Sequence, residues 1–444
     1  MNKFLKSSIL LASLFLCYSE VDAQTIKYTP CKEQISARER FDNARFGIFL
    51  HWGIYSMFAQ GEWYMQNNGI DKKEYAKAAN AFYPHSFDAK KWIKAIKDGG
   101  ARYICFTTRH HDGFSMWNTA QSDFNIMRTP YGKDVVKQLA DACHEEQMGL
   151  HLYYSHIDWT RDDYPMGRTG RNTGKDPHKA NWNSYYLFMN AQLTELLTNY
   201  GKVDGIWFDG WWDHDKDDQP FNWQLPEQYQ LIHRLQPACM IGNNHHQHPN
   251  EGEDMQIFER DVPGENKAGF SGQSIGTLPL ETCETMNNMW GYKVADQHYK
   301  SSSTLLRLLV RTAAKGANLL LNIGPQPDGN LPETALKRLS EMGEWLNSSA
   351  GESIYGTVAG EIVIGDSIVS TQSRNGKVHY LHILMDNTPT ELNLPVDLRS
   401  FKKVTHLQTG QSVRYVYNKK KKETKLMLPN AKKGTIDYIV KLSK

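Results

Sequence analysis

The chain has 444 residues, of which 40% are hydrophobic and 23% are charged, a composition typical of a globular protein. Its length suits one large barrel with a smaller second domain, or two to three domains of ordinary size. The formal net charge of +2 at pH 7 argues against nucleic acid as a partner.

Residues 1–23 have the pattern of a secretory signal peptide. Two lysines precede an apolar run, and Val21 and Ala23 form a small-residue cleavage site before Gln24. The apolar run is too short for a transmembrane helix, and no later stretch is long and apolar enough. We therefore expect export to the periplasm or the cell exterior, without stable membrane insertion.

A repeated pattern of apolar strand and amphipathic helix follows. In chain order, the expected strands are FGIFLHWG, RYICFTT, LHLYYS, VDGIWF, ACMIGNN, MQIFER and ANLLLNIG. The first long helical stretch places Trp92 and Ile96 on one face and stops at Gly99 and Gly100. Strands that are apolar throughout are typical of a parallel sheet that is buried on both faces. Seven or eight such units over about 320 residues favour an α/β fold of the (β/α)8 type, a TIM barrel, over a doubly wound sheet.

The pattern changes near residue 350 to short runs of alternating polar and apolar residues, such as EIVIGDSIVSTQS and VHYLHILM. Such runs predict an all-β sandwich. We therefore expect a barrel domain over residues 24–350 and a sandwich domain over residues 351–444. The lysine-rich stretch NKKKKETK, at 418–425, is expected to be the solvated tip of a hairpin.

Polar or aromatic residues follow almost every expected strand, at the end of the barrel where active sites lie. They are His51 and Trp52; Arg109, His110, His111 and Asp112; Tyr153, Tyr154, His156, Asp158 and Trp159; Asp209, Trp211 and Trp212; Asn243, Asn244, His245 and His246; Glu259 and Arg260; and Asn322. Folding alone does not require such a set, so we expect the active site here. Twelve tryptophans and 22 tyrosines also suit a sugar site, since aromatic faces pack on the C–H surface of a pyranose.

A metal site is one interpretation of these residues, because they include all the usual ligand types. Adjacent residues on a strand point to opposite faces, so His110 and His111 are not expected to bind one ion together. No HExxH motif occurs in the chain. The sequence therefore predicts neither a metal nor a cofactor, and a metal-dependent barrel hydrolase stays as an alternative.

Paired carboxylates are the second interpretation. Hydrolysis of a glycosidic bond needs one acid to attack or to activate water and another to protonate the leaving oxygen. Asp209 ends the most apolar strand and lies between aromatic residues, which favours it as the nucleophile. Its partner is expected at another strand end, where Glu259 lies, or on a later loop that contains Glu281 and Glu284. Glu62 in GEWY is also expected to face the pocket.

Eight motifs lie in order between about residues 44 and 330: RFGIFLHWGIYS, GEWYM, YICFTTRHHDGFSMW, LHLYYSHIDW, IWFDGWW, FERD, WGY and NLLLNIGPQPDG. As a set they resemble the glycoside hydrolase family 29 α-L-fucosidases, and the signal peptide suggests a secreted bacterial member. The resemblance implies retaining hydrolysis of terminal α-L-fucose, through a covalent glycosyl-enzyme and without a metal. The substrate would be a fucosylated oligosaccharide or glycoconjugate. No motif predicts an oligomeric state.

The resemblance also implies roles for individual residues. Asp209 matches the nucleophile, and the residues that match hydroxyl-binding positions are His51, Glu62, Trp63, His110 and His111. Either Tyr153 or Tyr154 would face the sugar. Trp207, which shares a strand face with Asp209, and Arg260 are also predicted to bind substrate.

The acid/base residue has two placements in this sequence. Glu259 is the first choice because FER ends a strand and keeps the acid next to Arg260, and Glu281 of LETC is the alternative. A catalytically inactive carbohydrate-binding protein is a further hypothesis, against which the presence of Asp209 and these candidate acids argues.

Overall fold

The computed structural model describes residues 28–270 and 272–444. The predicted signal peptide, residues 1–23, lies outside these ranges. Across the described residues, no helix has the length and apolar character needed to cross a membrane.

Eight parallel strands form one curved sheet in the order β5-β4-β3-β2-β1-β8-β7-β6. They are β1 (Phe46–Leu50), β2 (Tyr103–Arg109), β3 (Gly149–Ser155), β4 (Gly205–Asp209), β5 (Met240–Asn244), β6 (Gln256–Glu259), β7 (Leu280–Thr285) and β8 (Ala317–Ile323). The ends of the sheet approach each other where the amides of Asp254 and Met255, just before β6, donate to the carbonyl of Ile241 on β5. The barrel is thus nearly closed, and the predicted α/β barrel is confirmed.

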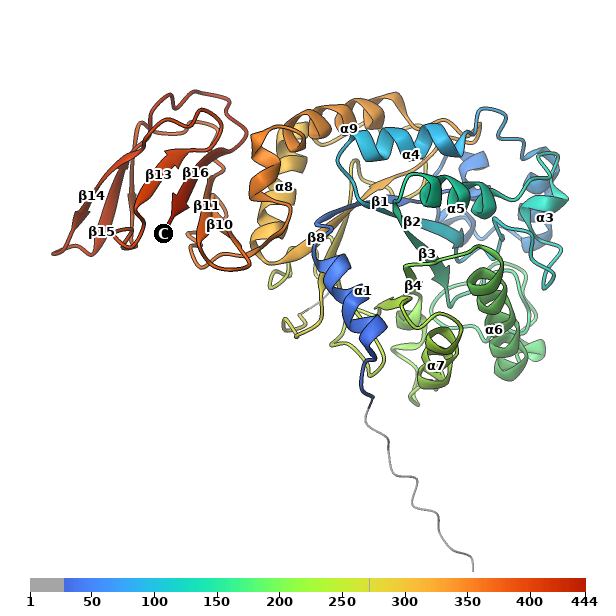
Figure 1. Cartoon of the computed structure of the whole chain (residues 1–444). Coiled ribbons are helices and arrows are strands. Elements are labelled where there is room, and N and C mark those ends of the chain that lie inside the picture. The colour runs from blue at the N-terminus through green and yellow to red at the C-terminus, as the bar shows by residue number, and fades with distance from the viewer. Residues whose placement is uncertain (1–27, 271) are drawn as a thin grey trace, which may run out of the picture.

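Helices surround this sheet (Figure 1). They are α1 (Lys32–Asp42), α4 (Ala89–Asp98), α5 (Val135–Glu145), α6 (Trp182–Asn199), α7 (Leu225–Leu235), α8 (Ser302–Ala314) and α9 (Glu333–Leu346), with the short α2 (Tyr64–Asn67) and α3 (Lys72–Ala76) after β1. The predicted stripe on α4 is confirmed, because Trp92 and Ile96 are buried, and the Trp92 indole donates to the Gly329 carbonyl at 3.0 Å. Loops rather than α-helices connect β5 to β6 and β6 to β7. These loops contribute to the mouth of the barrel at the carboxyl ends of the strands.

The segment LETCET differs from its prediction as a loop, because it forms β7 and pairs with β6 and β8. Four of its six residues are polar, and their side chains have partners within the protein. Thr282 donates from its hydroxyl to the Asp261 carbonyl at 3.0 Å, and Glu281 accepts two hydrogen bonds in the barrel interior. A strand whose polar groups are all paired inside the fold has no apolar signature in the sequence.

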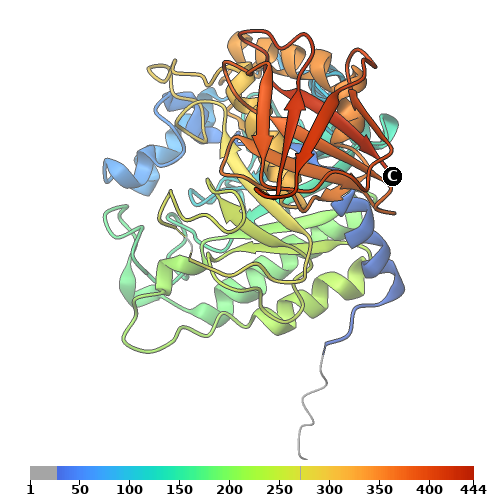
Figure 2. The ribbon, with the colours of Figure 1, turned by 90° about the vertical axis from the view of Figure 1, so that its left-hand side faces the viewer.

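The C-terminal part is a sandwich of two antiparallel sheets, as predicted, with orders β13-β16-β11-β10-β9 and β12-β15-β14. The strands are β9 (Thr357–Ala359), β10 (Ile368–Ser373), β11 (Val378–Ile383), β12 (Glu391–Leu394), β13 (Lys403–His406), β14 (Arg414–Asn418), β15 (Glu423–Met427) and β16 (Tyr438–Ser443). Leu381, Leu394, Leu426 and Val440 are fully buried between the sheets. Figures 1 and 2 show the sandwich beside α8, on one side of the barrel. Residue 350, the predicted boundary, lies in the short turn Ser349–Ser353 between α9 and β9.

Candidate active site

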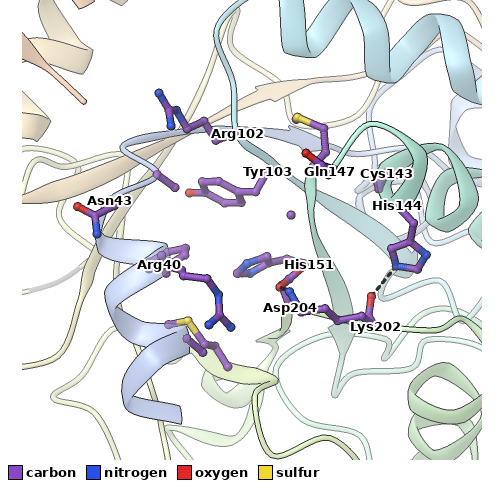
Figure 3. A pocket seen from close by; sticks show the side chains of 16 residues that line it. Arg40, Asn43, Arg102, Tyr103, Cys143, His144, Gln147, His151, Lys202 and Asp204 are labelled. Carbon is purple, nitrogen blue, oxygen red and sulfur yellow. Dashed lines mark hydrogen bonds and ion pairs between the residues drawn. The ribbon is translucent and has the colours of Figure 1, made fainter. Parts of the chain in front are cut away.

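Two cavities of similar size open at opposite ends of the barrel. One, of about 540 Å³, lies where the end of α1 faces the starts of β2 to β5, and Figure 3 shows Arg40, Tyr103, His151 and Asp204 around it. Asp204 is the only acidic residue that lines it, and its carboxylate is ion-paired with Lys202. The other, of about 550 Å³, lies at the carboxyl ends of the strands and is lined by several acids, histidines and aromatic residues. Of these two cavities, only the second is therefore lined by more than one carboxylate.

Asp209 ends β4 and reaches this second cavity with a carboxylate held by three donors. Its Oδ1 accepts the amide of Gly210 at 2.8 Å and the indole of Trp212 at 3.0 Å. Its Oδ2 accepts the hydroxyl of Tyr153 at 3.0 Å, and His111 Nε2 lies 3.5 Å away. Burial, followed by the nearby negative charge of Glu259, raises the pKa of Asp209 to about 6. The carboxylate is therefore fixed in orientation and ionised mainly above that pH.

Glu259 ends β6 and lines the same cavity. Asn244 and His246, which follow β5, donate to a single oxygen, Glu259 Oε2, at 2.8 and 2.9 Å. Burial alone would raise the pKa of Glu259, but the hydrogen bond and charge of His246 hold it below its usual value. The same contact raises the pKa of His246 against the effect of its own burial. The other oxygen, Oε1, accepts no hydrogen bond from the described residues, which leaves it free to contact a ligand.

Arg260 and Trp290 form the wall next to Glu259. The Arg260 guanidinium lies over the Trp290 ring, 4.9 Å from its centroid, and donates to the Asn288 carbonyl at 2.9 Å. Its second contact is with Glu284, at 3.4 Å. Arg260, which was predicted to bind substrate, therefore lines the cavity, but its guanidinium is tied to the wall.

Three neutral histidines line one side of the cavity. His51 Nδ1 faces the oxygen of the Asn322 amide at 2.7 Å, and the Asn322 nitrogen donates to the Trp290 carbonyl at 2.7 Å. Because the Asn322 oxygen accepts, these two hydrogen bonds assign the proton of His51 to Nδ1 and leave Nε2 as an acceptor. Burial lowers the pKa of His51 and of His111 to about 3, and it also lowers the pKa of His110 well below its usual value.

His110 and His111 lie on the same cavity, contrary to the expectation that they point to opposite faces. They follow the last residue of β2, Arg109, so strand alternation no longer applies to them, and their ring centroids are 4.2 Å apart. His110 stacks on Tyr153 at 5.4 Å, and its Nδ1 is buried without a partner in the described residues. His111 Nδ1 contacts the Ser155 hydroxyl at 2.7 Å.

Glu62 and Trp63, from the loop after β1, line the same cavity, where the Trp63 ring contacts His111 with centroids 5.7 Å apart. Glu62 is buried, and its Oε2 accepts the Gly291 amide at 2.6 Å. Burial raises the pKa of Glu62 above its usual value. Trp63 stacks on Trp212 with ring centroids 5.7 Å apart. Both residues thus line the cavity, as the sequence predicts.

Tyr153, and not Tyr154, faces the cavity. The two residues point to opposite sides of β3, and the Tyr154 hydroxyl donates to Gln192 on α6 at 2.7 Å. Tyr153 instead contacts Asp209 and stacks on Trp207 at 5.6 Å. Of the two tyrosines, Tyr153 is therefore the one on the inward face of β3, which the sequence did not decide.

Glu281 lies beneath the cavity rather than in its lining. Its carboxyl is fully buried in the barrel, where Oε1 accepts the indole of Trp207 at 2.8 Å and Oε2 accepts the hydroxyl of Tyr103 at 2.6 Å. Burial raises the pKa of Glu281 to about 7. Both oxygens are engaged with protein donors, which disfavours Glu281 as the residue that transfers a proton to a substrate.

Several cavity residues received no role from the sequence. They are Phe49, Trp212, Asn244, His246 and Trp290. Phe49 precedes His51 by two positions, so strand periodicity was a signal for it. Trp212, Asn244 and His246 follow strand ends, yet the chain has several polar or aromatic neighbours at each end, and only the loop conformation selects among them. In the described part of the chain, no group of three or more His, Cys, Asp or Glu side chains is arranged to hold a metal ion.

Comparison with known proteins identifies similar chains. The model of the α-L-fucosidase family matches residues 15–351. An α-L-fucosidase of Dictyostelium discoideum is 30% identical over 364 residues, which cover 74% of this chain and 75% of that protein. The structure of α-L-fucosidase isoenzyme 1 from Paenibacillus thiaminolyticus has a TM-score of 0.79 at 31% identity and covers 93% of this chain and 99% of its own. The Thermotoga maritima α-fucosidase in complex with fucose has a TM-score of 0.73 at 26% identity, covering 94% and 100%.

Proposed function

The chain belongs to the α-L-fucosidase family, and from this premise we propose that it is an exo-acting, retaining enzyme that removes terminal α-L-fucosyl residues from glycans. The observation that carries the proposal is the pair formed by Asp209 and Glu259. Each carboxylate ends a barrel strand in one cavity, and each is oriented by its own donors. Two carboxyl groups in such a site are the requirement of retaining glycoside hydrolysis.

In the first step, we assign the attack on the anomeric carbon to Asp209. Its Oδ1 accepts two protein hydrogen bonds, whereas Oδ2 accepts one, so Oδ2 is the better placed nucleophile. As the Oδ2–C1 bond forms, the bond from C1 to the glycosidic oxygen breaks, and Glu259 gives that oxygen a proton. Because the pKa of Asp209 is raised to about 6, activity should fall as the pH drops below this value.

In the second step, Glu259 takes a proton from water while the water oxygen bonds to C1 and the C1–Asp209 bond breaks. This restores both carboxyl groups and gives fucose with retained configuration.

His246 supports the acid/base cycle in this proposal. A single proton lies on the 2.9 Å hydrogen bond between His246 Nε2 and Glu259 Oε2, and it can reside on either partner. With the proton on Glu259, the carboxyl is the acid of the first step. Once Glu259 has passed this proton to the leaving group, it is the carboxylate base of the second step beside a neutral His246, and the proton that it takes from water restores the shared proton.

We propose that the histidine side of the cavity recognises the sugar hydroxyls. His51 presents a bare Nε2 that can accept a hydroxyl proton, and Glu62 keeps one oxygen beyond its bond to Gly291. Aromatic faces of Phe49 and Trp290 can cover the methyl group and the apolar ring face of a 6-deoxy sugar. A site built on hydrogen bonds to hydroxyls should strongly reject sugars of the wrong stereochemistry.

We also propose that the chain is exported, since residues 1–23 have the pattern of a cleavable signal peptide. N-terminal sequencing of the protein recovered from outside the cytoplasm of the producing cell should begin at Gln24. Recovery of the intact N-terminus from the cytoplasm would oppose this assignment.

The proposed activity is tested with purified protein and aryl glycosides. We expect release of the aryl group from an aryl α-L-fucoside, no detectable release from the matching α-D-glucoside, and full activity in the presence of a chelator. Proton NMR during the reaction should show α-fucose as the first product. Initial formation of the β-anomer would contradict the retaining mechanism, and loss of activity with the chelator would favour a metal-dependent hydrolase.

A further inference from the structure

The charge of the molecule is unevenly distributed along the chain. Residues 399–444 contain thirteen lysines and arginines but only two carboxylates, Glu423 and Asp437. The net charge of +2 for the whole chain therefore conceals a strongly basic segment on an otherwise acidic protein. This segment forms β13 to β16 of the sandwich, which are shown in Figure 1. Such an uneven charge distribution indicates which partners a protein attracts, and it says little about the fold.

Most of these cations have no carboxylate near them. Arg399, Lys425 and Lys441 form ion pairs, with Asp397, Glu391 and Glu352. The other ten, all within the described residues, are exposed and have no carboxylate oxygen within ion-pair distance: Lys402, Lys403, Arg414, Lys419, Lys420, Lys421, Lys422, Lys432, Lys433 and Lys444. Their charges repel one another and are not offset inside the protein.

Three of the unpaired cations border a groove on the sandwich. The groove, of about 660 Å³, lies between β13 and β14, at the edges of the two sheets, and is lined by Lys402, Lys403, Arg414, Tyr415, Val416 and Met427. The chain just before β13 contacts β14, where the Tyr415 hydroxyl donates to the Phe401 carbonyl at 3.4 Å. β14 then leads to the turn at 419–422, where four successive lysines are exposed.

We propose that this groove and the adjoining turn bind a strand of anionic polysaccharide. The cations would contact its sulfate or carboxylate groups, and the ring of Tyr415 and the side chain of Val416 would pack on the C–H faces of the sugars. The choice of a glycan as the anionic polymer rests on the proposed function, since an acidic glycan that carries fucose would be held near the enzyme that trims it.

The shape and composition of the surface favour a polysaccharide over other anionic partners. A groove bordered by cations can hold a single polymer strand, whereas a bilayer requires a broader face with several exposed apolar side chains. Val416, 60% exposed, is the single large apolar side chain of residues 399–444 with high exposure. Single-stranded nucleic acid would require a series of exposed aromatic stacking platforms, and Tyr415 and Tyr417 are both half-buried.

The test compares two triple variants that change the charge of the full-length protein equally. The groove variant is Lys402→Glu, Lys403→Glu and Arg414→Glu, and the control variant is Lys90→Glu, Lys91→Glu and Lys94→Glu on α4 of the barrel. Binding to heparin and to polygalacturonate, which supply sulfate and carboxylate groups, is titrated at several salt concentrations, with neutral dextran as the uncharged polymer.

We expect the wild type to bind at least one of the two anionic polymers and not dextran, with an affinity that falls as salt rises. The groove variant should lose about tenfold or more in affinity at 0.15 M salt, and the control variant no more than about twofold. Equal losses in both variants, or no binding by the wild type, would overturn the site. Tighter binding of phosphatidylserine vesicles or of DNA than of either polysaccharide would overturn the chemistry of the partner.

Hydrolysis of an aryl fucoside separates this inference from the proposed function. Both variants should retain wild-type kcat and KM, since neither triple touches the barrel cavity, and this retention also shows that they are folded. A wild type that binds polysaccharide but does not hydrolyse the fucoside would contradict the function and leave the site intact.

Discussion

Tyr153 and Tyr154 offer a matched pair for testing the donors around Asp209. Tyr153→Phe removes the donor to Oδ2 and should lower kcat/KM about 10- to 100-fold, because hydrogen bonds to a charged group contribute about 1.5–3 kcal/mol. Tyr154→Phe removes only the bond to Gln192, so activity should change less than about twofold while stability falls by about 1 kcal/mol. Steady-state kinetics and urea unfolding distinguish these effects. The opposite order of activities would place the wrong tyrosine in the site.

His246 should be visible in the pH dependence of the reaction. The imidazole and Glu259 share one proton, and the carboxylate lets His246 keep that proton to higher pH, as the raised pKa of His246 and the lowered pKa of Glu259 indicate. His246→Gln keeps a donor to Glu259 but cannot take up the proton. The alkaline limb of kcat/KM should therefore move to lower pH. A limb that stays in place, or that moves to higher pH, would show that His246 does not share the proton of the acid.

The sequence identified residues at strand ends well, because a parallel barrel brings these ends together whatever the loop conformations. It did not distinguish Tyr153 from Tyr154, since both lie in an apolar run and only the orientation of β3 in the barrel decides. His246 was equally hard to select among its neighbours, because its position, with a positive φ of 62°, depends on the turn after β5. Roles that rest on a contact between two loops have no local signature.

At the scale of elements, β7 could not be predicted from an apolar run, because four of its six residues are polar and are paired within the protein. Glu281 is the clearest case, and its pKa of about 7 makes a prediction for stability. The folded pKa lies above the unfolded value near 4.5, so the protonated carboxyl is favoured in the folded state. The stability that this provides is present in full below about pH 4.5 and is lost as the pH rises through 7.

Glu281→Gln should therefore remove part of the pH dependence of stability. Between pH 5 and 8, the free energy of unfolding of the variant should rise relative to that of the wild type, by up to about 3 kcal/mol. Urea unfolding at each pH measures this difference. It should also retain substantial activity, since an amide can accept the Trp207 indole and donate to the Tyr103 hydroxyl. Glu281→Leu is the contrasting variant, because it leaves the Trp207 indole and the Tyr103 hydroxyl without a partner. Its free energy of unfolding should fall by several kcal/mol. A loss of activity in Glu281→Gln that azide restores would return Glu281 to the acid/base role.

At the scale of the whole molecule, both the barrel and the sandwich were predictable, because the change from helical to alternating patterns marks their junction. Their packing was not, since it depends on side chains far apart in the sequence. Arg307 on α8 reaches the sandwich, where it donates to the Ile436 carbonyl at 2.9 Å and pairs with Asp386 at 2.6 Å.

Arg307→Ala should therefore loosen the sandwich from the barrel. We expect the free energy of unfolding to fall by about 2 kcal/mol, because the Ile436 carbonyl loses its partner. We also expect two separated steps in thermal unfolding. Arg374→Ala is the control at the same junction, where the half-exposed guanidinium pairs with Asp42 and should contribute less than about 1 kcal/mol. Equal effects of the two substitutions would mean that Arg307 has no special part in the junction.

The pairing of Asp209 with Glu259 is the central claim, and azide rescue tests it most directly. Asp209→Ala, Glu259→Ala and Glu281→Ala are assayed on an activated aryl fucoside with and without azide. Glu259→Ala should be accelerated by azide and give fucosyl azide of retained configuration, while Asp209→Ala should be almost inactive without azide. Wild-type turnover by Asp209→Ala, or a retained azide product from Glu281→Ala in place of Glu259→Ala, would contradict the account.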